Sequence, residues 1–259
     1  MGWLIWTIII LIVLALILGF GWYHCHRAIR RPRVPQISHF TTNSNSNSNS
    51  NSNSNSNSNS KNQLAYALID DPYEKPFVME SILTPEQCRS IINQSRPRLA
   101  DSQVVGGRDS TVRNSKQCWL SKHDPLIRPV YDRIAQTFGI PFENAEDLQV
   151  VRYEPGQYYK PHHDSCCEDI AKCREFAKVG GQRKLTVLVY LNDAFEGGST
   201  EFPNLGFTAK PPPGDAIVFY PLANNTNRCH PLALHGGMPV TSGEKWVANL
   251  WFRESKFKD

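Results

Sequence analysis

A run of nine Asn-Ser repeats, residues 43–60, divides the chain into parts that cannot share one core. The run has no apolar side chain to bury, so it cannot offset the conformational entropy that ordering would cost. We therefore expect a flexible spacer with a root-mean-square reach of roughly 23 Å. Since the chain has 259 residues, the 199 residues after the repeats must form any sizeable core.

The segment before the repeats is almost entirely apolar. Between Trp3 and Tyr23 only one threonine and two glycines fall outside the hydrophobic class. As a helix this stretch would rise about 31 Å, roughly the thickness of the hydrocarbon core of a bilayer. We predict a transmembrane anchor over residues 1–26 that contacts the membrane through residues 3–23. The alternative is a cleaved signal peptide, although the run lacks a basic start and an evident small-residue cleavage site.

Charge is distributed unevenly along the chain. The net charge of +4 comes from 28 basic and 24 acidic residues. Residues 1–60 contain four arginines, all between Arg27 and Arg33, and no acidic residue, so residues 61–259 are neutral overall. A neutral domain lacks the basic field that nucleic-acid binding needs, so we expect no nucleic-acid partner and disfavour nucleic-acid demethylation. Residues 27–60 are interpreted as a basic juxtamembrane segment and a linker.

Residues 61–259 combine two predicted helices with several short predicted strands. Thr84-Pro85-Glu86-Gln87 has the residues of a capping box and predicts a helix of about ten residues. Asp124-Pro125 predicts the start of a second helix. Short apolar runs then predict four strands, at residues 148–153, 185–191, 216–220 and 246–252. Helices followed by short strands, with Gly and Pro between them, favour an α+β domain with a double-sheet barrel or jelly roll.

His162-His163-Asp164 supplies two types of metal ligand at a useful spacing. On a strand, residues i and i+2 point to the same face, so His162 and Asp164 would share one ion while His163 points away. His235, in a His-Gly-Gly sequence before the last predicted strand, is the candidate third ligand. Two histidines and one carboxylate leave positions open for a co-substrate and dioxygen, which is typical of non-haem Fe(II) oxygenases.

Lys245 begins the last predicted strand. A cation that is buried in a pocket needs an anionic partner. A dicarboxylic co-substrate that chelates the iron through one end would supply that partner through its other end. Tyr153 and Thr200 offer hydroxyl groups to the same carboxylate.

The stretch from Val151 to Phe252 resembles the catalytic domain of collagen-type and plant-type prolyl 4-hydroxylases. These are Fe(II)- and 2-oxoglutarate-dependent dioxygenases with a double-stranded β-helix core. Five segments carry the resemblance: YEPGQYYKPHHD, GGQRKLTVLVYLND, EGGSTEFP, KPPPGDAIVFY and LHGGMPVTSGEKWVANLWF. Weaker similarity reaches back through Asp109–Leu120, which in the family lies near the substrate groove. The resemblance implies a jelly-roll core with flanking N-terminal helices in a dioxygenase domain over residues 61–259.

The resemblance also implies a role for each candidate residue. It implies an iron triad of His162, Asp164 and His235. It implies a 2-oxoglutarate site made by Lys245 with two hydrogen-bonding helpers, Tyr153 and Thr200. It places three side chains along the peptide groove: Tyr159, Arg183 and Trp251. Without the family, Arg183 is interpreted as a solvated charge and Trp251 as a core residue.

These roles imply 4-hydroxylation of proline in proline-rich or collagen-like polypeptides, coupled to decarboxylation of 2-oxoglutarate to succinate and CO₂. The implied cofactors are Fe(II), 2-oxoglutarate, O₂ and ascorbate. Two alternatives stay open. The first is a 2-oxoglutarate oxygenase that acts on another residue or on a free amino acid. The second is a non-catalytic, membrane-tethered module that only binds peptides.

Cysteines and glycosylation motifs bear on location. Six cysteines follow the spacer and permit up to three disulfides, while zinc binding by Cys166, Cys167 and Cys173 is an alternative. Asn93 and Asn224 begin possible N-glycosylation motifs. Both observations favour an oxidising lumen, whereas the arginines after the apolar run favour a cytosolic domain. We predict a monomer anchored in the endoplasmic reticulum with a lumenal catalytic domain, against the charge pattern.

Overall fold

The computed structural model describes residues 66–104, 107, 109–168 and 171–258. The predicted anchor, the juxtamembrane arginines and the Asn-Ser repeats lie outside these residues. No helix among the described residues is both long enough and apolar enough to cross a membrane.

Thirteen strands in the described part of the chain make up two facing sheets and a ribbon. The larger sheet contains β1 (Phe77–Met79), β2 (Ala100–Asp101), β3 (Lys116–Leu120), β4 (Leu148–Tyr153), β6 (Arg183–Tyr190), β10 (Ala216–Phe219) and β13 (Lys245–Arg253). The smaller sheet contains β5 (Tyr159–His162), β8 (Thr200–Phe202), β9 (Phe207–Ala209) and β11 (His235–Gly237). The ribbon pairs β7 (Phe195–Gly197) with β12 (Val240–Gly243).

All of the ladders between these strands are antiparallel. The larger sheet runs in the order β1-β10-β6-β13-β4-β3-β2, and the smaller in the order β5-β11-β8-β9. Neighbouring strands are therefore distant in sequence, as expected for a jelly roll. The predicted α+β fold with a double-stranded β-helix core and flanking helices is confirmed.

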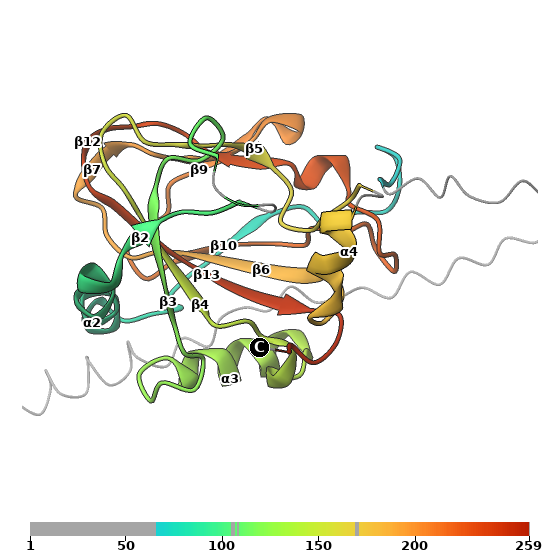
Figure 1. Cartoon of the computed structure of the whole chain (residues 1–259), viewed down its shortest axis with the longest axis horizontal. Helices are drawn as coiled ribbons and strands as arrows, with labels where there is room; N and C mark the ends of the chain where they lie inside the picture. Colours follow the sequence, from blue (N-terminus) through green and yellow to red (C-terminus); the bar gives the residue numbers. More distant parts are fainter. Residues whose placement is uncertain (1–65, 105–106, 108, 169–170, 259) are drawn as a thin grey trace, which may run out of the picture. The chain divides into compact units, whose positions relative to one another are not determined.

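Among the residues that the structure describes, three α-helices accompany the sheets: α2 (Pro85–Ser95), α3 (Arg128–Phe138) and α4 (Ala171–Lys178). Short 3-10 helices cover residues 96–98, 142–144, 203–205 and 231–233. The predicted capping box of α2 is present, because the Thr84 hydroxyl accepts from the Gln87 backbone N–H at 3.2 Å and the Gln87 side chain accepts from the Thr84 N–H at 2.9 Å. Figure 1 shows α2 and α3 on the side of the larger sheet away from β5 and β9.

The start of α3 differs from its prediction. The helix begins at Arg128 rather than beside Asp124. Asp124 instead closes a preceding turn, in which its carboxylate accepts from the Leu126 N–H at 2.8 Å and its carbonyl accepts from the Ile127 N–H at 2.9 Å. The helix ends at Gly139, whose left-handed φ of 64° is easily adopted by glycine.

The four predicted strands are confirmed to within two residues at each end, as β4, β6, β10 and β13. Their alternating side chains separate two apolar cores. On β13, Trp246, Ala248, Leu250 and Phe252 belong to the core on the helix side of the larger sheet. Val247 belongs to the core between the two sheets. The inward-facing half of this alternation also lines the cavity that holds the candidate site.

Candidate active site

A cavity of about 420 Å³ opens between the two sheets. Alternate residues of β13 form much of one wall: Lys245, Val247, Asn249, Trp251 and Arg253. The predicted metal ligands line the same cavity, on the side of β5 and β11. The pleat of one strand and the pairing of two others therefore bring residues from distant parts of the chain to one place.

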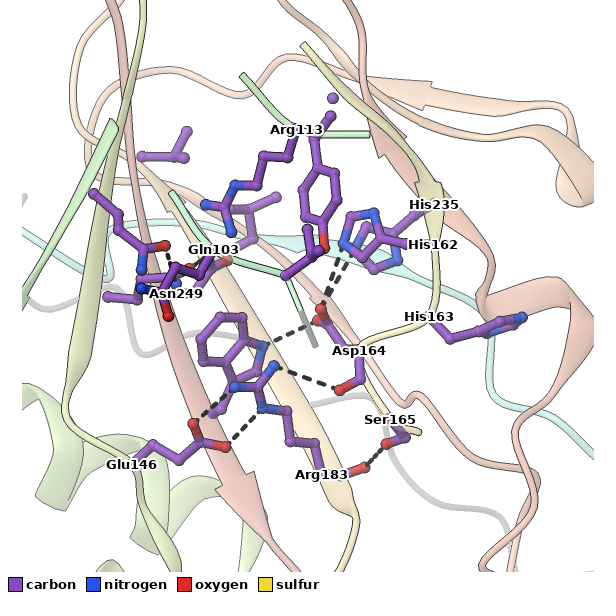
Figure 2. A pocket seen from close by; sticks show the side chains of 18 of the residues that line it. Gln103, Arg113, Glu146, His162, His163, Asp164, Ser165, Arg183, His235 and Asn249 are labelled. Carbon is purple, nitrogen blue, oxygen red and sulfur yellow. Dashed lines mark hydrogen bonds and ion pairs between the residues drawn. The ribbon is translucent and has the colours of Figure 1, made fainter. Parts of the chain in front are cut away.

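The three predicted metal ligands converge at a single point (Figure 2). His162 ends β5, His235 begins β11, and the two residues are direct partners in the ladder. Asp164 Oδ1 lies 3.7 Å from His162 Nε2 and 3.8 Å from His235 Nε2. The ligand atoms of all three side chains lie within 4.8 Å of one another, which suits a shared ion.

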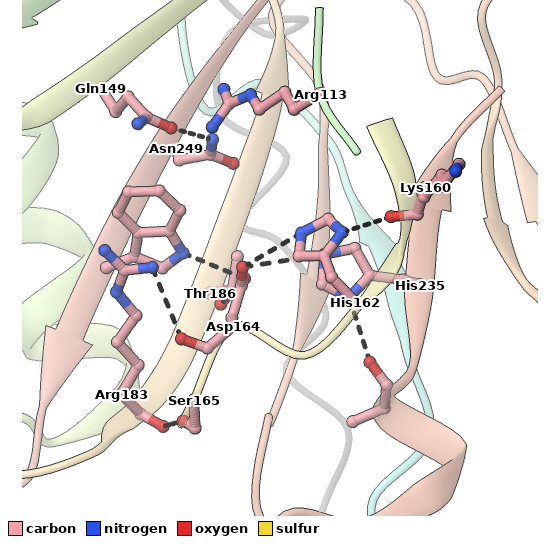
Figure 3. A network of polar contacts seen from close by, with 12 residues as sticks. Arg113, Gln149, Lys160, His162, Asp164, Ser165, Arg183, Thr186, His235 and Asn249 are labelled. Carbon is pink, nitrogen blue, oxygen red and sulfur yellow. Dashed lines mark hydrogen bonds and ion pairs between the residues drawn. The ribbon is translucent and has the colours of Figure 1, made fainter. Parts of the chain in front are cut away.

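Backbone carbonyls orient both histidine rings (Figure 3). His162 Nδ1 lies 2.9 Å from the carbonyl of Lys160, and His235 Nδ1 lies 3.0 Å from the carbonyl of Ala233. A carbonyl only accepts, so each Nδ1 carries the proton and each Nε2 keeps its lone pair toward Asp164. Such hydrogen bonds from the far ring nitrogen are usual for metal-binding histidines.

Two side chains of the larger sheet hold the Asp164 carboxylate. Thr186 Oγ1 and Trp251 Nε1 donate to Asp164 Oδ2 at 2.7 and 3.0 Å. Both bonds go to one oxygen, so Oδ1 stays directed at the two histidines. Because Thr186 and Asp164 are 1% and 7% exposed, little water competes with this arrangement.

The electrostatics of the triad suit a cation. Burial acts to raise the pKa of Asp164, but His235 and His162 outweigh that effect and hold the pKa well below its usual range. Burial, with a smaller contribution from His162, lowers the pKa of His235 to about 4, so this ring is neutral near pH 7. One carboxylate and two imidazoles with oriented lone pairs fit Fe(II) and leave positions open for other ligands.

His163 turns away from the triad, as its position predicts, and Tyr159 covers the triad from the other side. The His163 ring contacts Tyr66 edge-on at a centroid distance of 5.4 Å. Tyr159 stacks on His162 at 3.5 Å, and the Arg113 guanidinium lies 4.7 Å from the Tyr159 ring. Burial raises the pKa of Tyr159 to about 12, so its hydroxyl keeps its proton near neutral pH.

Lys245 lies in the same cavity as a buried cation, 2% exposed. Its Nζ lies 5.3 Å from the ring of Tyr153 and 4.9 Å from that of Tyr190. No acidic side chain of the described residues forms an ion pair with it. Burial, and to a lesser degree Lys210, therefore lowers the pKa of Lys245 to about 7. A bound carboxylate would supply the missing partner.

The two predicted hydroxyl-bearing helpers line the same cavity as this lysine. Tyr153 is the ladder partner of Lys245 across β4 and β13, and it lines the cavity. Thr200 is 2% exposed, and its Oγ1 lies 2.8 Å from the hydroxyl of Tyr190. The structure thus brings Lys245, Tyr153 and Thr200 to one end of the cavity, together with Tyr190, which the sequence reasoning missed.

Arg183 and Trp251 line the cavity near Asp164 and are tied into the protein. The Arg183 guanidinium stacks on the Trp251 ring at 3.4 Å. It also makes two hydrogen bonds to Glu146, of 2.6 and 2.8 Å. Arg183 is therefore neither a solvated charge nor a free cation, and Trp251 is a ligand-orienting residue rather than only a core residue.

Two disulfides flank the triad. Cys166 pairs with Cys173, and Cys167 pairs with Cys229. The zinc alternative for the cysteines after Asp164 is therefore wrong, because their thiols are consumed in disulfides. Cys88 and Cys118 are free and buried. The second disulfide links the loop after Asp164 to the segment that leads to His235, so it ties two parts of the metal site together.

Three further residues of the site escaped the sequence reasoning: Thr186, Tyr190 and Glu146. The sequence does contain a signal for Thr186 and Tyr190. Both are polar residues that interrupt the apolar run of β6, and both alternate with Leu188 on the face of the strand that points to the cavity. The sequence contains no local signal for Glu146, since its partners Arg183 and Arg253 lie 37 and 107 residues away.

Comparison with known proteins shows similarity across this site. Residues 148–253 match the model of the 2OG-Fe(II) oxygenase superfamily. A candidate prolyl 4-hydroxylase of Acanthamoeba polyphaga mimivirus is 58% identical over 197 residues, or 76% of this chain and 81% of that protein. Prolyl 4-hydroxylase 1 of Arabidopsis thaliana is 38% identical over 198 residues, or 68% of each chain.

A solved structure is also similar. A viral collagen prolyl hydroxylase from Paramecium bursaria Chlorella virus-1, in complex with 2OG, has a TM-score of 0.55 and 31% identity to this chain. The match covers 72% of this chain and 98% of that one. The region that matches the family model includes the converging triad and Lys245.

The hydrogen bond from Thr186 predicts an effect on metal affinity. In Thr186→Val, which keeps the side-chain volume, Asp164 loses one of its two orienting bonds. We expect the affinity for Co(II), followed by its absorption spectrum, to fall about 10-fold or more, in the range typical of outer contacts to metal ligands. The matched control is Thr208→Val on the exposed face of β9. Equal affinity in wild type and Thr186→Val would contradict this role.

Replacing Lys245 should abolish the stabilisation by a bound dicarboxylate without lowering the stability of the ligand-free protein. A saturating dicarboxylate should raise the wild-type melting temperature by about 5–10 °C, at roughly 100 times its Kd. In Lys245→Met, with Mn(II) in place of iron, we expect this 2-oxoglutarate-induced shift to disappear. The ligand-free variant should melt no lower than wild type, because a folded-state pKa below the unfolded value means that the buried cation destabilises the fold at neutral pH.

The same lysine sets a pH dependence. As pH rises through about 7, Lys245 loses its proton, and the affinity of wild type for 2-oxoglutarate should weaken by up to about 10-fold per pH unit. Lys184→Met is the control, since Lys184 is exposed on β6 and does not line the cavity. A full thermal shift in Lys245→Met would show that the carboxylate binds elsewhere.

Proposed function

From the premise that this chain belongs to the plant- and virus-type prolyl 4-hydroxylases of the 2OG-Fe(II) oxygenase superfamily, we propose that it hydroxylates proline in proline-rich or collagen-like polypeptides. Prolyl 4-hydroxylation with Fe(II) and 2-oxoglutarate is the activity of this family. The finer proposal concerns the polypeptide class and the roles of individual side chains.

One observation carries the enzymatic proposal. A three-ligand metal site and a buried lysine without an acidic partner share one cavity. A module that only bound peptides would gain nothing from an uncompensated buried cation, which costs stability. A dicarboxylate that reaches from the metal to Lys245 accounts for both features together.

The protein's own residues position the reactants. We assign His162, Asp164 and His235 to Fe(II), and Lys245 with the hydroxyls of Tyr153 and Thr200 to the distal carboxylate of 2-oxoglutarate. Bound Fe(II) supplies the activation of O₂ that couples decarboxylation of 2-oxoglutarate to hydroxylation of a C–H bond. The sheets around the cavity exclude water, and Thr186 with Trp251 keeps one oxygen of Asp164 directed at the metal position.

The peptide is expected to lie along the open side of the same cavity. We assign Tyr159, Arg183 and Trp251 to its wall, since all three line the cavity beside the triad. Flat aromatic faces suit proline rings, and a polyproline II peptide is already stiff, so its binding loses little conformational entropy. Glu146 pairs with both Arg183 and Arg253, which holds the Arg183 guanidinium against the Trp251 ring in this wall.

The activity is tested with a peptide panel in the presence of Fe(II), 2-oxoglutarate and ascorbate. Peptides that contain proline should gain one oxygen atom, located at C4 by fragmentation and hydrolysis. His162→Ala and His235→Ala should abolish both product and succinate, whereas His163→Ala is the matched control, because that ring points away from the triad. Oxygen gained only at a lysine or on a free amino acid would overturn the choice of substrate.

We also propose that residues 3–23 anchor the protein in the membrane of the endoplasmic reticulum, with the catalytic domain in the lumen. Support comes from the length and apolarity of that segment and from the two disulfides, which persist in oxidising compartments. The four arginines after the segment argue for the reverse orientation.

Glycosylation provides the test of orientation. Asn224 is exposed in a turn, whereas the motif at Asn93 lies in α2 and its Ser95 is 0% exposed. In a eukaryotic cell the lumenal orientation predicts a glycosidase-sensitive mass shift that Asn224→Gln removes and Asn93→Gln leaves largely in place. An unglycosylated domain that proteases reach in intact microsomes would show a cytosolic orientation.

A further inference from the structure

The wall of the cavity contains an exposed tryptophan that has no part in the roles assigned above. Trp119 on β3 is 43% exposed and lines the cavity. Its neighbours Cys118 and Leu120 point into the core on the other face of the sheet. A tryptophan buries a large apolar area when it is covered, so an uncovered ring that faces a cavity is a candidate ligand contact.

Trp119 continues the aromatic wall that begins at the metal site. Its ring centroid lies 6.0 Å from that of Trp251, with a tilt of 46°. Trp251 in turn donates its indole N–H to the metal ligand Asp164. Trp119 therefore lies one aromatic ring farther from the triad than Trp251.

A ladder of side-chain amides runs across β3, β4 and β13, and Figure 3 shows its hydrogen bond between Gln149 and Asn249. Gln149 donates to the Gln117 carbonyl oxygen at 2.8 Å, and Asn249 donates to the Gln149 carbonyl oxygen at 3.0 Å. Gln117 and Asn249 are half-buried and line the cavity. The Gln117 amide nitrogen and the Asn249 carbonyl oxygen, at the two ends of the ladder, have no partner among the described residues.

The occupant that fits the indole and amide groups is extended and carries rings. These groups offer stacking and hydrogen bonds, whereas Arg113, which lines the same cavity, packs against the Tyr159 ring and donates to Ser115. A polyproline II segment has flat pyrrolidine rings, and its backbone carbonyls make no internal hydrogen bonds, so they need outside donors. An amide donor beside an aromatic face meets both requirements of such a segment.

We propose that Trp119, with the Gln117–Gln149–Asn249 ladder, forms a second subsite that binds a proline ring flanking the hydroxylated proline. Trp119 therefore favours a proline ring over a small side chain at the flanking position. This inference rests on the proposed prolyl hydroxylation and deepens it, since it names a specificity-determining residue outside the metal and 2-oxoglutarate sites.

The test compares three peptides, each with one reactive proline. The short peptide has only small neighbours. Two long peptides carry either 4-hydroxyproline or alanine at the flanking positions, because 4-hydroxyproline keeps the ring but is not a substrate. The measured quantity is kcat/KM for each peptide with wild type, Trp119→Ala, Trp119→Phe and Val78→Ala.

In wild type, we expect the ring-flanked long peptide to exceed both others in kcat/KM by about 5- to 10-fold, the size typical of an aromatic contact. Trp119→Ala should remove most of this advantage, mainly through KM, and Trp119→Phe should keep about half of it. Val78→Ala is the matched control, since Val78 is 44% exposed on the same sheet but does not line the cavity. Far-UV circular dichroism and the melting temperature report on folding.

Two results would overturn the subsite. One is a wild type that treats all three peptides alike, and the other is a Trp119→Ala variant that keeps the full advantage of the ring-flanked peptide. A failure of the proposed activity looks different, because wild type would then oxidise no proline in any of the peptides.

Discussion

The Asp164 carboxylate is the point on which the site depends. One oxygen accepts from Thr186 and Trp251 on the larger sheet, and the other faces His162 and His235 on the smaller sheet. One side chain thus connects the two layers of the jelly roll. Because both orienting donors are buried, they hold the Asp164 carboxylate with one oxygen directed at the two histidines. Water is excluded by the same packing that holds the ligand.

The buried cations that line the cavity differ in whether they have an acidic partner, and this difference separates their roles. Glu146 forms ion pairs with both Arg183 and Arg253, so these guanidinium groups are held in place in the wall that carries Trp251. Lys245 lies against the rings of Tyr153 and Tyr190 and forms no ion pair with an acidic side chain of the described residues. A dicarboxylate would therefore find its partner at Lys245, while the stretch from Trp251 to Trp119 presents aromatic rings and amides to a peptide.

Local patterns predicted those elements whose residues carry a strong local signal. The capping box at Thr84 and the apolar runs of β4, β6, β10 and β13 were found, because their side chains repeat at the period of a helix turn or a pleat. The start of α3 was misplaced, since Asp124 satisfies a turn as readily as a helix. The strands of the smaller sheet were missed, because β5 and β11 are short and rich in Pro, His and Gly.

The sequence by itself determined the chemistry of the site: the types of the three ligands, the lysine that begins the last strand, and the parity that puts Lys245 and Trp251 on one face. Only the tertiary structure decided how these groups pair. Glu146 with Arg253, Cys167 with Cys229, and Thr186 with Asp164 lie far apart along the chain. Such pairings depend on strand order and register, which are set by burying both faces of the larger sheet at once. They therefore leave no local pattern in the sequence.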